Sequence, residues 1–163
     1  MYQSFAKSLV ASALCISSLV ALAQDAAIPR HLQLAREFVT NTKQENNSYS
    51  NRNIYTRMPG DLFASEYVVA TDCGGFVEDM FRRTNSGVLE QLKTKKFKTR
   101  FSIFDWHPSI EKQEAFTRIL KVTDIKPGDV AAWLYTEKVT HTLPGHILFI
   151  DSLPVRLNKP RKP

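Results

Sequence analysis

The sequence contains few cysteines and histidines and no internal repeat, and each shortage excludes a class of protein. Two cysteines among 163 residues exclude a small scaffold built on several disulfides. The four histidines are scattered, and they do not combine with the cysteines in the spacing of a zinc site. We therefore expect one globular domain that needs neither a metal nor another cofactor.

The one long apolar run lies at the N-terminus. Residues 8–23 are almost all apolar or small, follow Lys7, and end in ALA, an A-x-A cleavage pattern. The run is shorter than the roughly 20 residues that a transmembrane helix needs. We predict a signal peptide over residues 1–23, a mature domain over 24–163, a secreted or periplasmic location, and no stable membrane insertion after cleavage. Acylation of Cys15 is the competing interpretation, but Leu14 is not the small residue that such a site requires.

Cleavage would leave Cys73 as the single cysteine of the mature chain. It lies in the segment TDCGGFVEDMFRR, residues 71–83, whose apolar positions from Phe76 onward fall on one helical face. Asp72 is a favourable N-cap residue, so the segment predicts a helix that begins at the cysteine. The dipole and free N–H groups at a helix start stabilise a thiolate, the reactive form of cysteine. A buried, unreactive core cysteine is the alternative.

The remaining patterns predict helices first and strands later, an α+β arrangement. Residues 28–40 have the periodicity of an amphipathic helix that opens at Pro29, and residues 110–120 have that of a second one. Residues 41–53 are polar, which predicts a loop. Residues 101–109 are rich in aromatic side chains, and we expect them to be irregular. Apolar runs at 130–135 and 145–150 predict two strands, with a third expected at 155–158.

His146 is the histidine best suited to act on the cysteine. It lies in an apolar strand, where an unpaired polar side chain is costly unless it has a purpose. Imidazole is also the base that matches a thiol near neutral pH. A core histidine with satisfied hydrogen bonds is the alternative. We expect His31 and His141 to be exposed, and His107 either to line a cleft or to cover the core.

The basic run at residues 93–100 bears on binding partners. Its lysines and arginine are punctuated by Phe97 and followed by Phe101, a pattern that can also bind nucleic acid. In an exported protein we interpret it as a solvated face or a contact with an anionic envelope polymer, and we expect no nucleic-acid partner. Loss of Lys7 on cleavage would leave 21 basic and 16 acidic side chains, a net charge of +5 that favours anionic neighbours.

Three motifs resemble the NlpC/P60 peptidase family. DCGGFV at residues 72–77 resembles the family signature Asp-Cys-Ser-Gly-Phe-Val. KPGDV at 126–130 resembles its Pro-Gly-Asp turn, and GHI at 145–147 is similar to its histidine strand. Gly74 stands in place of the serine, and the family's Tyr-x-x-Gly-Gly stretch before the cysteine is absent.

The resemblance implies a papain-like α+β fold, with N-terminal helices packed on a small antiparallel sheet. It implies Cys73 as nucleophile and His146 as base in an exported cysteine amidohydrolase, a peptidoglycan endopeptidase or amidase. An acyltransferase that uses the same pair, and a non-catalytic envelope-binding protein, remain alternatives.

A third residue should orient the imidazole from the strand that follows it. Asn158 would share a face with His146 if the intervening turn has three residues, and Asp151 is a second candidate. Sheets of this family usually continue beyond this point, so we expect the sheet to be incomplete at the C-terminus.

Overall fold

The computed structural model describes residues 28–52, 54–96, 100–135, 144–153 and 155. The predicted signal peptide, His141 and Asn158 lie outside these residues, as does most of the expected strand at 155–158. Within them the elements are α2 (Arg30–Asn41), β1 (Asn47–Tyr49), β2 (Tyr55–Arg57), β3 (Val68–Thr71), α3 (Cys73–Arg83), α4 (Val88–Lys96), α5 (Ile103–Glu111), β4 (Val130–Leu134) and β5 (Gly145–Phe149), with short 3₁₀ turns at Gln44–Asn46 and Val122–Asp124. This mixture confirms the α+β class.

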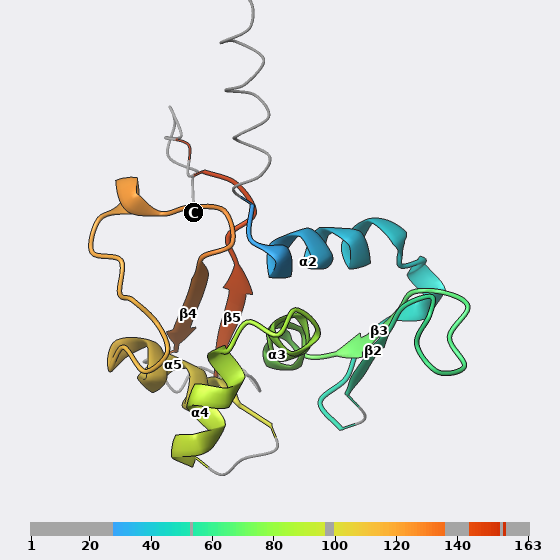
Figure 1. Ribbon diagram of the computed structural model, residues 1–163, viewed down its shortest axis with the longest axis horizontal. Coiled ribbons are helices and arrows are strands. Elements are labelled where there is room, and N and C mark those ends of the chain that lie inside the picture. Colours follow the sequence, from blue (N-terminus) through green and yellow to red (C-terminus); the bar gives the residue numbers. More distant parts are fainter. Residues whose placement is uncertain (1–27, 53, 97–99, 136–143, 154, 156–163) are drawn as a thin grey trace, which may run out of the picture.

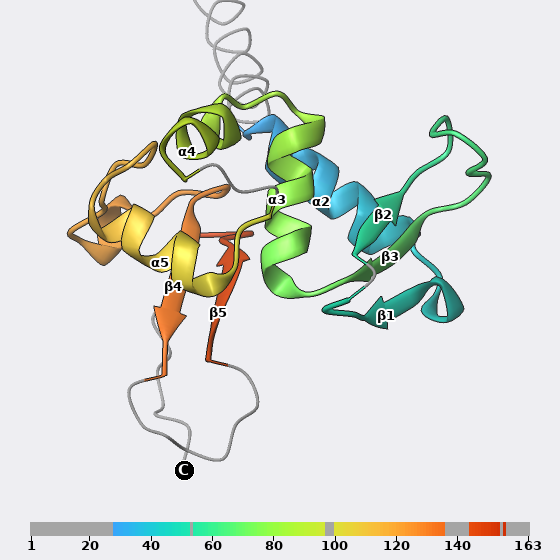
Figure 2. The same ribbon diagram turned by 90° about the horizontal axis from the view of Figure 1, so that it is seen from below.

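Helix α3 lies between two small sheets (Figure 1). On one side β4 and β5 form an antiparallel hairpin, against which α3 and α5 pack. On the other side β3 is the middle strand of the order β1-β3-β2. The view from below shows the same placement, with the green α3 between the hairpin and the second sheet (Figure 2). The predicted packing of helices on a small antiparallel sheet is therefore confirmed for the hairpin.

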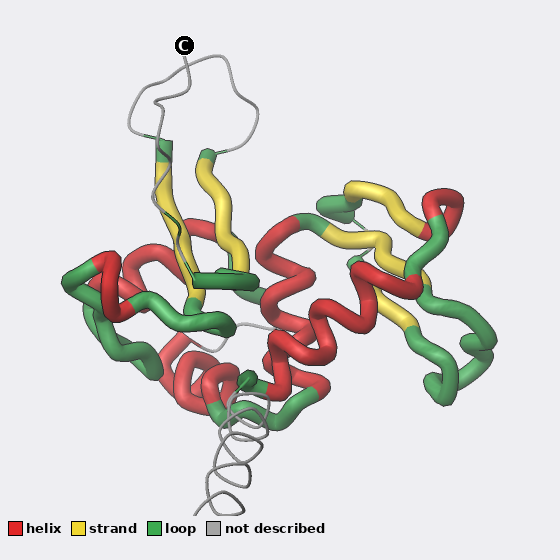
Figure 3. The backbone as a smooth tube through the Cα atoms, turned by 90° about the horizontal axis from the view of Figure 1, so that it is seen from above, coloured by secondary structure: helices red, strands yellow, loops and turns green. Residues whose placement is uncertain are grey.

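The three-stranded sheet corrects the expectation that all strands follow the helices. Residues 41–53, predicted as a loop, contain β1, which pairs in parallel with β3, while β2 pairs antiparallel with it. Figure 3 shows the yellow strands in two separate groups with red helices between them. All three residues of β1 are exposed, so no apolar alternation marks it, and its strand conformation comes from pairing with β3.

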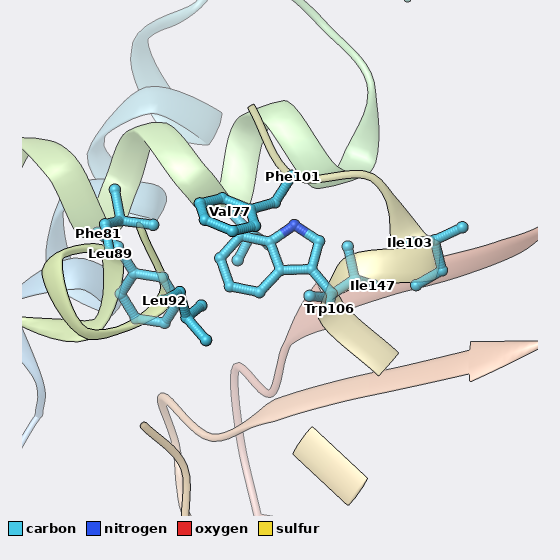
Figure 4. Close-up of a cluster of buried hydrophobic side chains, with 8 residues drawn as sticks. All are labelled: Val77, Phe81, Leu89, Leu92, Phe101, Ile103, Trp106 and Ile147. Carbon is cyan, nitrogen blue, oxygen red and sulfur yellow. The ribbon is translucent and has the colours of Figure 1, made fainter. Parts of the chain in front are cut away.

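The larger core cluster surrounds the indole of Trp106 (Figure 4). Its buried members are Val77, Phe81, Leu89, Leu92, Phe101, Ile103, Trp106 and Ile147. A second cluster joins Ala35 and Phe38 of α2 to Met80 of α3. Because α3 contributes side chains to both clusters, its position is fixed from two sides.

The structure shifts one predicted helix toward the N-terminus. Residues 101–109 were expected to be irregular and 110–120 helical, but α5 spans Ile103–Glu111. A capping box starts it, in which the Asp105 carboxylate accepts hydrogen bonds from the backbone N–H and hydroxyl of Ser102 at 2.9 and 2.7 Å. The helix cannot continue beyond Glu111, because Gln113 and Ala115 adopt positive φ angles of 57° and 62°.

His31 is half-buried, so the prediction of an exposed residue was wrong. Its Nε2 lies 2.8 Å from the carbonyl oxygen of Gly128, in the turn before β4. Its ring packs against Phe81 and Phe149, with centroid distances of 5.0 Å to each. His31 therefore joins the start of α2 to the hairpin.

Arg83, at the end of α3, ties this helix to the β2 region. Its guanidinium donates to both carboxylate oxygens of Asp61 at 2.8 and 3.0 Å, to Asp79 at 2.7 Å, and to the carbonyl of Thr56 at 2.8 Å. The hydrogen bond from Arg83 lowers the pKa of Asp61 below its usual value, and the backbone N–H of Met58 and nearby positive charge add to this effect.

The Asp61 pair predicts a pH-dependent stability. A group with a depressed pKa stabilises the fold above its unfolded value of about 3.9, and that contribution disappears as the pH falls through the folded value. We expect Asp61→Asn to lower the free energy of unfolding by about 1.5 kcal/mol at pH 7. In urea titrations the difference from the unchanged protein should shrink below pH ~4.

Asp124→Asn is the matched control, because Asp124 is exposed and its carboxylate accepts a hydrogen bond from the hydroxyl of the neighbouring Thr123. It should leave stability almost unchanged at both pH values. A loss for Asp61→Asn that is equal at pH 3 and pH 7 would contradict the role of the charged pair.

Candidate functional site

Cys73 stands at the turn from β3 into α3, as the sequence predicts. Asp72 is the N-cap, and its carboxylate accepts a hydrogen bond from the backbone N–H of Gly75 at 2.7 Å. The other carboxylate oxygen pairs with Arg100, which also donates to the carbonyl of Asn51 at 3.2 Å. The Cys73 thiol is free and half-buried. The helix start and its cap are therefore confirmed.

Gly75 is required by the close packing of this turn. A β-carbon at this position would lie 2.6 Å from Cγ2 of Ile54 and would also overlap the Thr71 hydroxyl. A β-carbon at Gly74 would meet less resistance, with its nearest neighbour the Phe101 carbonyl oxygen at 3.3 Å. Position 75 therefore tolerates a side chain less well than position 74, although the two are adjacent in the sequence.

His146 is on β5 with its ring turned away from the core. Its neighbours Gly145 and Ile147 are buried, and alternation along the strand places His146 on the other face. There its ring packs edge-on against Trp133, its cross-strand partner, at a centroid distance of 5.2 Å. His146 is half-buried, which leaves the imidazole accessible to a reactant.

One cleft brings Cys73 and His146 together. It has a volume of about 730 Å³ and lies among α2, the start of α3, β1 and β5. Its lining consists of Leu32, Ala35, Arg36, Val39, Thr40, Tyr49, Val69, Thr71, Asp72, Cys73, Phe76, Val77, His146, Ile147, Leu148, Phe149 and Asp151. Among the described residues, the thiol and the imidazole make no direct hydrogen bond with each other. Such contacts in a free enzyme often shorten only when substrate binds.

Asp151, the second candidate for the orienting residue, binds Arg36. Nε of Arg36 donates to the carboxylate at 2.7 Å, and Nη2 donates to the Asp151 carbonyl at 2.7 Å. Both residues line the cleft. The carboxylate is thus engaged by an arginine and not by His146, and the first candidate, Asn158, lies outside the described residues.

Tyr49 is a cleft residue that the sequence reasoning missed. It pairs with Thr71 in the β1–β3 register, two positions before the cysteine. Partial burial raises the pKa of Tyr49 above its ordinary value, and the negative charges of a Cys73 thiolate and of Asp72 raise it further. Its hydroxyl therefore stays protonated and can donate a hydrogen bond near the thiolate. Only the pairing of β1 with β3 reveals this proximity.

His107 lies apart from the cysteine, and of the side chains of the basic run only that of Arg100 is among those that the structure describes. His107 lines a different cavity of about 810 Å³, and its Nδ1 lies 3.4 Å from Glu111. Arg100, at the end of the run, pairs with the α3 cap residue Asp72 and so supports the site. Among the described residues, no three His, Cys, Asp or Glu side chains gather as a metal site would require.

Comparisons with protein-family models, with curated proteins and with solved structures found no match for this chain. In the part of the chain that the structure describes, every helix is too short or too polar to cross a bilayer.

The packing around Gly75 predicts that a larger residue at this position destabilises the fold. Gly75→Ala should lower the free energy of unfolding by about 2 kcal/mol, because its methyl group overlaps Ile54 and Thr71. Gly74→Ala is the matched control and should change stability by less than about 1 kcal/mol, since the higher helix propensity of alanine offsets one tight contact. Urea unfolding measures both. Equal losses of stability in the two variants would show that steric overlap does not restrict position 75 to glycine.

A second prediction concerns the indole of Trp106. Its Nε1 is buried and has no hydrogen-bond partner among the described residues, and it lies 3.6 Å from the β-carbon position at Gly74. Gly74→Ser would place a hydroxyl where it can accept from this N–H. We expect a gain of about 1 kcal/mol over Gly74→Ala in the same unfolding assay. A serine variant no more stable than the alanine variant would contradict the expected hydrogen bond.

Proposed function

We propose that this protein is an exported cysteine amidohydrolase of the cell envelope, with Cys73 as nucleophile and His146 as base. The observation that carries the proposal is that both residues line one cleft, Cys73 from a capped helix start and His146 from the facing hairpin. This is the relation between cysteine and histidine that the NlpC/P60 resemblance implies. A papain-like fold is part of the proposal.

The proposed reaction passes through a thioester. His146 takes the thiol proton, and the Cys73 sulfur attacks the carbonyl carbon of the amide to form a C–S bond. As the C–N bond breaks, the imidazolium returns its proton to the leaving amine. His146 then deprotonates a water molecule, which attacks the thioester and releases the acid and the free thiol.

The oxyanion that forms on the carbonyl would be stabilised at the start of α3. The first N–H groups of a helix have no partner within the helix, so the backbone N–H of Cys73 is available to the oxyanion. Tyr49 lines the same cleft as Cys73, and its hydroxyl is our candidate for a second donor to the oxyanion.

The resemblance supports peptidoglycan stem peptides as the substrate, and the net charge of +5 left by the 21 basic and 16 acidic side chains of the expected mature chain favours an anionic polymer as partner. One observation favours a second candidate, an acyltransferase that uses the same pair. The cleft beside Cys73 is lined mainly by apolar side chains, which suit an acyl chain.

The decisive experiment measures products released from purified sacculi by the mature protein. Cys73→Ala should lower release by about 10³-fold or more, because the nucleophile is lost. His146→Ala should lower it by about 10²- to 10⁴-fold, the usual contribution of a general base. His107→Asn is the matched control, because His107 lies in another cavity, and it should retain the full rate.

Three results would redirect the proposal. Transfer of an acyl group to an added amine or lipid, with loss in Cys73→Ala, would favour the acyltransferase. Binding to sacculi without any product would favour a non-catalytic envelope-binding protein. Release that persists in Cys73→Ala would remove Cys73 from the chemistry.

A further inference from the structure

The walls of the Cys73 cleft are apolar on three sides. Helix α2, helix α3 and strand β5 each contribute two or more apolar residues to its lining. These are Leu32, Ala35 and Val39 from α2, Phe76 and Val77 from α3, and Ile147, Leu148 and Phe149 from β5. Val39 is 75% exposed at the outer rim, although it lies on the same helix as the buried Ala35 and Phe38. An apolar residue so exposed at a cleft rim is available to a ligand.

The charged side chains that line the cleft are already paired. Arg36 and Asp151 neutralise each other through contacts at 2.7 Å. Asp72 is held by Arg100 and by the backbone N–H of Gly75. A substrate carboxylate in this cleft would therefore have to displace an existing partner to gain a positive one, whereas an uncharged chain needs no such exchange.

The volume of about 730 Å³ lies within the range of sites that bind small organic molecules, roughly 300–1,000 Å³. We infer that the acyl group held in this cleft is an uncharged aliphatic chain, bound along α2 and β5 with its carbonyl carbon at the Cys73 sulfur. This inference rests on the second candidate of the proposed function, the acyltransferase, which takes Cys73 as the nucleophile, and it narrows the donor of that enzyme to fatty-acyl compounds. In this arrangement the leaving group of the acyl donor lies outside the apolar part of the cleft.

The acylation step balances without any further reactant. The Cys73 sulfur forms a bond to the carbonyl carbon, and the bond from that carbon to the leaving oxygen, nitrogen or sulfur breaks. The leaving atom takes the proton that His146 removed from the thiol. Water or an amine then accepts the acyl group, and the thiol is regenerated.

The test is the rate at which 4-nitrophenyl esters of increasing chain length acylate Cys73. Acetyl, butyryl, hexanoyl and octanoyl esters are compared with a glutaryl ester, which carries a terminal carboxylate. Nitrophenolate release gives the rate, and the mass of the intact protein identifies the acylated species. Each added CH₂ should raise the second-order rate up to about fourfold while the cleft accommodates it. The glutaryl ester should react more slowly than the hexanoyl ester.

A matched pair of variants tests whether the acyl chain of the ester occupies the cleft. Val39→Asp puts a charge on the rim, and it should lower the ratio of octanoyl to acetyl rates by about tenfold or more. Leu62→Asp introduces the same charge at a residue that is 79% exposed and outside the cleft lining, and it should leave the ratio unchanged.

The outcomes separate the two levels of the hypothesis. Acylation of Cys73 at a rate independent of chain length, or faster with the glutaryl ester, would overturn the aliphatic-chain inference and leave Cys73 as the nucleophile. Nitrophenolate release that is the same in Cys73→Ala would overturn the proposed function, and the inference with it.

Discussion

The pairing of Asp72 with Gly75 and Arg100 is the interaction on which the rest of the site depends. It fixes the first turn of α3, and thereby the position of the Cys73 thiol, at the edge of the three-stranded sheet. Because α3 buries side chains toward both sheets, the turn cannot shift without disturbing two cores. A side chain held by such a junction is preorganised, and its alignment costs no ordering when a ligand arrives.

The parts of the fold that could be predicted carry strong local signals. The Pro29 start of α2, the cap and apolar face of α3, and the two apolar runs of the β4–β5 hairpin are all confirmed. The parts that could not be predicted depend on distant contacts. β1 exists only through pairing with β3, and with it comes the nearness of Tyr49 to the cysteine. The start of α5 is different, because the capping box of Ser102 and Asp105 was present in the sequence, although the aromatic composition suggested irregular structure.

The motifs and the cleft bear on different aspects of the proposed reaction, the motifs on its chemistry and the cleft on its substrate. The motifs predict the reacting groups, a cysteine sulfur and an imidazole, and both residues line one cleft. They say little about the rest of the substrate, because specificity is set by the walls and not by the nucleophile. Much of the wall comes from α2, an element that none of the three motifs includes.

Gly75 shows why a glycine shared between two proteins is weak evidence that they are related. The side chains of Thr71 and Ile54 leave no room for a β-carbon there, so any chain that packs these two residues against the turn favours glycine, whatever its ancestry. A shared glycine at this place is therefore equally compatible with common descent and with convergence on the same turn. Evidence of kinship has to come from residues that packing leaves free to vary. Gly74, where other proteins carry serine, is one such position.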